Sequence, residues 1–199
     1  MAELYFYYGS SCFGKSTTAI NTYFKYRKKG KKVLALYCPS LNDKNTYIWS
    51  RSLGMLWTKI KPVFITNELL EQSPYKDFEI FIFDEIQNKT VEEIHTIIEH
   101  VNKYNKICYF FGARFDPVGR EIPEVKEILD RCNICPLEVK CDYKGCNNKA
   151  FTAVNLKHDR IVLNPAANDL ETIRVVKLCE KHFNCMTKDY TGKRKNLQA

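Results

Sequence analysis

The sequence lacks any uninterrupted apolar run of the ~18 residues that a membrane-spanning helix needs, so we expect no membrane partner. Residues 1–5 contain neither the basic nor the apolar segment of a secretory signal, which favours a cytoplasmic protein. Internal repeats and low-complexity tracts are also missing. What is present is 199 residues, 45% hydrophobic and 27% charged, as in a globular domain with at most a small appendage.

Cysteine is abundant, but the nine residues are an odd number, and without a secretory signal we expect reduced thiols or metal ligands rather than a disulfide framework. Six of them lie in the last third of the chain. The net charge is +8, with basic clusters at residues 26–32 and 188–195. We interpret these clusters as a solvated helix end and a terminal tail in preference to a nucleic-acid site.

Strand-like and helix-like segments alternate along residues 1–140. Apolar runs predict strands at residues 4–8, 32–37, 62–66, 78–83 and 107–111. Helical spacing of apolar residues predicts helices from residue 15 to Gly30 and over residues 91–101, the second beginning near Thr90. Residues 40–61 are expected to mix loop with a short helix. This alternation is typical of an α/β fold with a mainly parallel sheet covered by helices on both faces.

A glycine-rich segment, Gly9-Ser10-Ser11-Cys12-Phe13-Gly14-Lys15-Ser16, fits the pattern G-x-x-x-x-G-K-[ST] between a predicted strand and a predicted helix. The glycines allow backbone N–H groups to point at phosphate oxygens, and the helix N-terminus adds positive charge. Lys15 is predicted to reach the β- and γ-phosphates, and Ser16 to ligate Mg²⁺.

Two carboxylates, Asp84 and Glu85, follow the apolar strand at residues 78–83. Strand ends line the ligand crevice in sheets of this kind. We therefore predict that Asp84 holds Mg²⁺ with Ser16 and contributes to ATP binding, and that Glu85 is the catalytic base toward an acceptor hydroxyl or water.

Two pairs of potential metal ligands, Cys141/Cys146 and Cys179/His182, are 33 residues apart and suit a structural zinc site. A lobe this small has little core of its own, so a metal would stabilise it. Cys132 and Cys135 have a C-x2-C spacing, but the surrounding pattern predicts a strand, which would point them to opposite faces. Cys185 could replace one of the ligands. We expect domains at residues 1–140 and 141–186, and a basic flexible tail at 187–199.

The order of these features resembles the cytosolic-type (type II) thymidine kinases along most of the chain. The matching segments are residues 83–87 (F-D-E-I-Q), 50–54 (S-R-S-L-G), 109–116 with Gly119 (Y-F-F-G-A-R-F-D), 148–150 (N-K-A) and 178–183 (L-C-E-K-H-F). The resemblance implies transfer of the γ-phosphoryl group of ATP·Mg²⁺ to the 5′-hydroxyl of thymidine or a related deoxynucleoside, a salvage route to dTMP for DNA synthesis. It also implies a homotetramer.

The resemblance further implies roles for particular residues. Gln87 would join the ATP-binding residues. Residues 151–176 would form a lasso loop that clamps the nucleoside, with the zinc as its anchor. The nucleoside would be bound by Arg51, Phe115, Asp116, Pro117 and Val175.

The base pocket departs from the family pattern. Pro117 and Val175 stand where the family has aromatic residues, Asn88 replaces another aromatic residue, and Ser11 stands where a methionine usually faces the base. Two alternatives therefore stay open: a nucleotide-binding relative with altered or lost nucleoside phosphorylation, and a nucleic-acid-binding ATPase.

Overall fold

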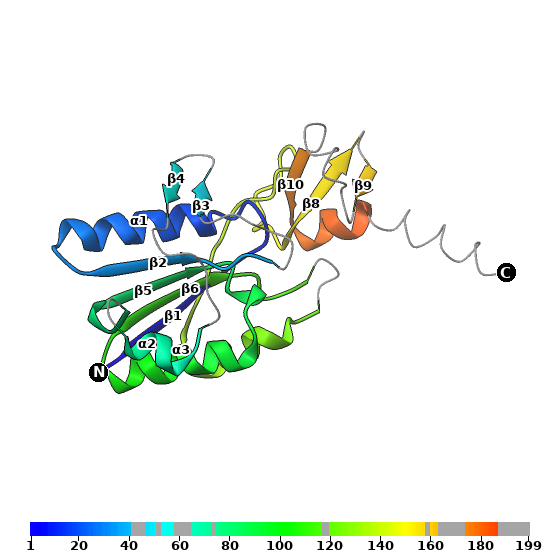
Figure 1. Ribbon diagram of the computed structural model, residues 1–199. Coiled ribbons are helices and arrows are strands. Elements are labelled where there is room, and N and C mark those ends of the chain that lie inside the picture. The colour runs from blue at the N-terminus through cyan, green and yellow to red at the C-terminus, as the bar shows by residue number, and fades with distance from the viewer. Residues whose placement is uncertain are drawn as a thin grey trace. The chain divides into compact units, whose positions relative to one another are not determined.

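The computed structural model describes residues 1–40, 47–50, 53–57, 65–72, 75–116, 120–157, 160–162 and 174–186 (Figure 1). The chain forms two compact units. The first consists of Met1–Gly9 and Gly14–Leu137, and the second of Ser10–Phe13 and the residues from Glu138 onward. Within the described ranges, no helix is both long and apolar enough to cross a membrane.

The first unit is built on a five-stranded sheet in which every neighbouring pair of strands is parallel. Its strand order is β2-β5-β6-β1-β7. The bounds are Glu3–Tyr8 for β1, Val33–Tyr37 for β2, Ile80–Asp84 for β5, Ile107–Gly112 for β6 and Asn133–Pro136 for β7. The predicted parallel α/β sheet is confirmed.

Helices cover both faces of this sheet, as predicted (Figure 1). They are α1 (Lys15–Lys28), α2 (Asn67–Glu71), α3 (Val91–Lys103) and α4 (Lys126–Arg131), with 3-10 turns at Tyr75–Asp77, Ile86–Asn88 and Pro123–Val125. The α1 helix ends where Gly30 adopts a φ of +76°, and Thr90 caps α3 by accepting a hydrogen bond from the N–H of Glu93.

Successive side chains along the buried strands point to opposite faces of the sheet, and each face has its own hydrophobic core. In β2, Leu34 and Leu36 pack with α3 on one face, whereas Val33 and Ala35 pack with α1 on the other. Strands buried on both faces are apolar at every position, which is why the sequence runs at residues 33–36 and 80–83 read as strands.

A β-hairpin of β3 (Tyr47–Ser50) and β4 (Gly54–Trp57) lies where loop and a short helix were expected. Ile48 and Leu56 are buried in the α1-side core. The Ser50 hydroxyl, itself buried, lies 2.7 Å from the hydroxyl of Thr17 on α1. Of the strand expected at residues 62–66, only Ile65 and Thr66 are described, and they precede α2 without forming a strand.

The second unit contains a three-stranded antiparallel sheet in the order β10-β8-β9. Its strands are β8 (Thr152–Lys157), β9 (Arg160–Val162) and β10 (Arg174–Leu178), and residues 180–186 are helical. Among its described residues, the buried core cluster consists of Cys141, Val154, Leu156, Leu178 and Cys179.

Candidate functional site

The glycine-rich loop joins β1 to α1, which is the context that the motif requires. Cys12 and Gly14 both have left-handed backbone conformations, with φ of +64° and +86°. Gly14 is the N-cap of α1, so the first N–H groups of that helix lie at the end of the loop. Lys15 is buried and its Nζ donates to the carbonyl oxygen of Gly9 at 3.0 Å.

Ser16 and Asp84 meet at the carboxyl edge of the sheet. The Ser16 hydroxyl donates to Asp84 Oδ2 at 2.7 Å, and the other oxygen, Oδ1, is buried with no hydrogen-bond partner among the described residues. Burial, with a smaller contribution from Glu85, raises the pKa of Asp84 to about 7. A hydroxyl beside a buried carboxylate with a spare oxygen is an all-oxygen donor set that suits Mg²⁺, and a bound dication would favour the ionised carboxylate.

Glu85 turns away from the strand immediately after Asp84. Its backbone is left-handed (φ +58°, ψ 42°), which is uncommon for a residue other than glycine. The Glu85 carboxylate accepts a hydrogen bond from Gln87 Nε2 at 2.5 Å, and Gln87 Oε1 accepts one from the N–H of Ala113 at 3.1 Å. The Gln87 side chain thus links Glu85, which follows β5, to Ala113, which follows β6.

A cavity of about 260 Å³ opens beside these groups. Its lining includes the polar residues Ser16, Asp84 and Glu85 and the aromatic residues Tyr37, Tyr47 and Trp49. The aromatic lining residues belong to the end of β2 and to the β3–β4 hairpin. The sequence did not predict this hairpin. A cavity lined by a hydroxyl, two carboxylates and aromatic rings can bind both a polar group and a planar or apolar group.

The residues predicted to bind the nucleoside are placed only in part. Arg51 and Pro117 lie outside the described residues. Phe115 is 44% exposed, and Asp116 accepts hydrogen bonds from the backbone N–H and the Nε of Arg120, both at 2.8 Å. Val175 is half-buried in β10, opposite Asn155. Phe115 and Asp116 belong to the first unit, and Val175 belongs to the second.

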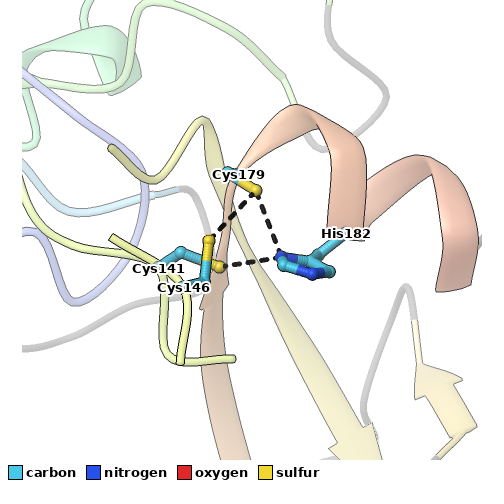
Figure 2. Close-up of side chains that lie close together, drawn as sticks. All are labelled: Cys141, Cys146, Cys179 and His182. Carbon is cyan, nitrogen blue, oxygen red and sulfur yellow. Dashed lines mark hydrogen bonds between the residues drawn. The ribbon is translucent and has the colours of Figure 1, made fainter. Parts of the chain in front are cut away.

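Four side chains of the second unit converge as the spacing of the cysteines predicted: Cys141, Cys146, Cys179 and His182 (Figure 2). Their ligand atoms all lie within 4.8 Å of one another. His182 Nδ1 is 3.5 Å from Cys141 Sγ and 3.2 Å from Cys179 Sγ, and the sulfurs of Cys146 and Cys179 are 3.9 Å apart. Tetrahedral zinc would separate two sulfurs by about 3.8 Å and a sulfur from a nitrogen by about 3.5 Å. The cluster therefore fits such an ion.

Neighbouring groups hold this cluster in place. The ring of Tyr143 stacks on that of His182, with centroids 4.0 Å apart and planes 14° from parallel. Asp142 accepts from the N–H of Lys177 at 2.8 Å, which ties the 141–146 turn to β10. The N–H of His182 donates to Cys179 and lowers the pKa of that thiol to about 6, which favours the thiolate that a metal binds. Sequence spacing predicted the four ligands but not these supporting contacts.

The other C-x2-C pair is not a chelating pair. Cys132 packs against the core on the α3 side of the sheet, whereas Cys135 in β7 lies beside Tyr7, which packs on the α1 side. The strand predicted here is present as β7, which contains Cys135 and begins one residue after Cys132, and the two side chains lie on opposite faces as predicted. Burial raises the pKa of Cys132 to about 12, as expected for a core thiol.

A parallel sheet with a glycine-rich loop leading into a helix, and a Ser/Asp pair at the carboxyl edge, defines a P-loop α/β protein with an added Cys/His metal cluster. The family model described as thymidine kinase matches residues 2–183, and the chain belongs to that family. It is similar to the thymidine kinase of Enterobacteria phage T4, at 26% identity over 94% of this chain and 98% of the relative. It is also similar to that of Aliivibrio fischeri, at 25% identity over 92% and 97%.

Proposed function

We propose that the protein is an ATP-dependent thymidine kinase. The observation that carries the proposal is the grouping of Ser16, Asp84 and Glu85 at one cavity, in a chain that belongs to the thymidine kinase family over residues 2–183. Relatives that bear the name thymidine kinase match nearly their full length, which supports the same activity for this chain.

In the proposed mechanism the phosphates of ATP lie along residues 9–16, where loop N–H groups, the α1 N-terminus and Lys15 neutralise their charge. Ser16 and Asp84 would hold Mg²⁺, which would offset the negative charge that develops on the phosphates during transfer. Glu85 accepts the proton of the 5′-hydroxyl as that oxygen attacks the γ-phosphorus and ADP leaves.

The second unit would hold the nucleoside and a structural zinc ion. Cys141, Cys146, Cys179 and His182 offer three thiolates and one imidazole, a common set for a closed structural site. We infer that residues 151–176 between the two ligand pairs form the lasso loop over the nucleoside, including Val175. We also infer a homotetramer, which light scattering of the purified protein would test.

The test is transfer of labelled γ-phosphoryl from ATP across a panel of nucleosides, in wild type and in Glu85→Gln. Glu85→Gln keeps the size of the side chain but cannot accept the proton, so turnover of thymidine should fall roughly 10²–10⁴-fold while ATP binding persists. Binding of ATP by the wild type without phosphorylation of any nucleoside would contradict the proposal. ATP hydrolysis stimulated by oligonucleotides would point instead to a nucleic-acid-dependent ATPase.

A further inference from the structure

The side chain of Gln87 connects Glu85 to the end of strand β6. Its Nε2 donates to Glu85 Oε2 at 2.5 Å, and its Oε1 accepts from the N–H of Ala113 at 3.1 Å. The backbone N–H can only donate, and an ionised carboxylate can only accept, so these two neighbours together fix which end of the amide faces each of them. The Gln87 amide therefore has one orientation that satisfies both contacts.

We propose that Gln87 is a positioning residue that orients the Glu85 carboxylate toward the acceptor hydroxyl, an inference that rests on the proposed function. Holding Oε2 leaves Oε1 as the oxygen that faces the hydroxyl. The left-handed backbone of Glu85 (φ +58°) sets the direction in which the side chain leaves the strand, and Gln87 sets its final rotation. Positional errors of about 1 Å at a reacting group can cost about 100-fold in rate.

Gly112 makes room for this arrangement. A Cβ atom added at Gly112 would lie 2.7 Å from Gln87 Oε1 and 2.9 Å from Ile86 Cγ2. Ile86 is completely buried, so it has little freedom to yield. The carbonyl oxygen of Gly112 also accepts from the N–H of Gly9 at 3.3 Å. The end of β6 thus contacts Gly9, the first residue of the phosphate loop, and Gln87, which is hydrogen-bonded to the proposed catalytic base Glu85.

This role differs from the nucleotide-binding role that the family resemblance implies for Gln87. A residue that contacts phosphates should change the affinity for ATP when it is replaced. A residue that acts through Glu85 should change kcat and leave ATP affinity and the KM for ATP nearly constant. It should also lose most of its effect once Glu85 is absent, because the two side chains then no longer act together.

The test uses Gln87→Met, which keeps the length of the side chain and removes both hydrogen bonds, in wild-type and Glu85→Ala backgrounds. Gln72→Met is the matched control, because Gln72 is exposed in the same unit. In the wild-type background we expect kcat to fall about 10–100-fold with the Kd for ATP within about 2-fold. In the Glu85→Ala background the further loss should stay below about 3-fold. Equal losses in the two backgrounds, or a parallel loss of ATP affinity, would overturn the proposal.

A second variant and a second readout keep the proposal testable on its own. Gly112→Ala pushes on the same amide and on the buried Ile86 from the strand, so it should lower kcat at least as much as Gln87→Met does. Hydrogen exchange should quicken at the Ala113 amide in Gln87→Met and not in Gln72→Met, and unchanged exchange would refute the contact. The remaining outcome is that the wild type phosphorylates no nucleoside while the Ala113 amide still exchanges faster in Gln87→Met than in Gln72→Met. That result would refute the proposed function and leave the contact established.

Discussion

Lys15 is a buried cation next to the phosphate loop, and its removal tests that loop directly. Lys15→Ala should lower the rate of phosphoryl transfer by about 10²–10³-fold, because one charge that stabilises the transferring group is lost. Steady-state kinetics with ATP and thymidine provide the measurement. Lys28→Ala removes the same charge from the exposed end of α1 and serves as the control. Activity of Lys15→Ala within a few-fold of wild type would rule out the phosphate-binding role.

His100 predicts a pH dependence of stability. The residue is buried in α3, where its ring packs edge-on against Phe81 and its Nε2 has no hydrogen-bond partner among the described residues. Burial, together with the nearby cations Lys106 and Lys103, lowers the pKa of His100 to about 4, although Glu71 opposes this shift. Between pH 6.5 and pH 4, His100 is therefore mostly neutral in the folded state and mostly protonated in the unfolded chain.

The contribution of His100 to stability is thus complete above pH 6.5 and is lost as the pH falls toward 4. We expect the free energy of unfolding to drop by about 1–2 kcal/mol more in wild type than in His100→Phe between pH 7 and pH 5. Urea titrations of both proteins at the two pH values measure this difference. Parallel pH profiles would show that His100 titrates as in the unfolded chain.

At the scale of elements, α3 begins with a capping box formed by Thr90 and Glu93. Glu93 also accepts hydrogen bonds from outside the box. Thr90 Oγ1 accepts from the N–H of Glu93, and Glu93 accepts from the N–H of Thr90. The buried Glu93 carboxylate also accepts from Lys89 Nζ at 2.8 Å and from the N–H of Ile65 at 3.0 Å. The Glu93 carboxylate therefore accepts from three donors on two segments of the chain, residues 89–90 and Ile65.

Substitutions in this box should differ in cost. Thr90→Ala should lower the free energy of unfolding by about 1 kcal/mol, the usual value for a lost cap. Glu93→Ala should cost about 2–4 kcal/mol, because it removes a buried carboxylate that accepts from Lys89 Nζ and from two backbone N–H groups. Chemical denaturation of the two variants would show the order. Equal losses would mean that Glu93 acts only as a cap.

The elements that the sequence predicted are those with an unambiguous apolar pattern. Strands β1, β2, β5 and β6 are continuous apolar runs, and α3 has an apolar stripe that begins at its cap. The β3–β4 hairpin was missed because each strand has four residues, and Ile48 and Leu56 are the apolar residues that the structure describes as buried there. Two buried positions do not establish a period, and the packing of Ser50 against Thr17 depends on tertiary structure.

In the candidate site around Asp84, too, the sequence predicted only the contacts that follow from strand order. The meeting of Ser16 and Asp84 follows from the topology of a parallel sheet, since both residues follow strands that end at one edge. The contact from Ala113 through Gln87 to Glu85 depends on the left-handed backbone of Glu85 and on the missing side chain at Gly112, neither of which a spacing rule reports.

At the scale of whole units, the buried core of the second unit shares side chains with the Cys/His cluster. Cys141 and Cys179, two of the five buried residues in the core cluster described for this unit, are also candidate ligands, so metal binding and core packing would involve the same side chains. We expect close to one zinc ion per chain, and Cys179→Ser should release it and unfold this unit, since site formation and folding are coupled. Metal analysis and limited proteolysis are the measurements.

Cys185→Ser is the matched control, because Cys185 is exposed and lies three residues beyond His182. It should retain the metal. If Cys185→Ser empties the site while Cys179→Ser does not, the ligand set is wrong. Protein purified under native conditions without zinc would refute the site as a whole.

The position of β1 in the sheet bears on synthesis by the ribosome. Strand β1 is the first to be made, yet its neighbours are β6 and β7, whose residues are translated about 100 or more positions later. At about 5–20 residues per second, the segment Leu4–Tyr8 waits roughly 5–20 s before β6 exists. During that interval a strongly aromatic strand has no partner from its own sheet, so nascent chains should recruit holdase chaperones to their first ten residues.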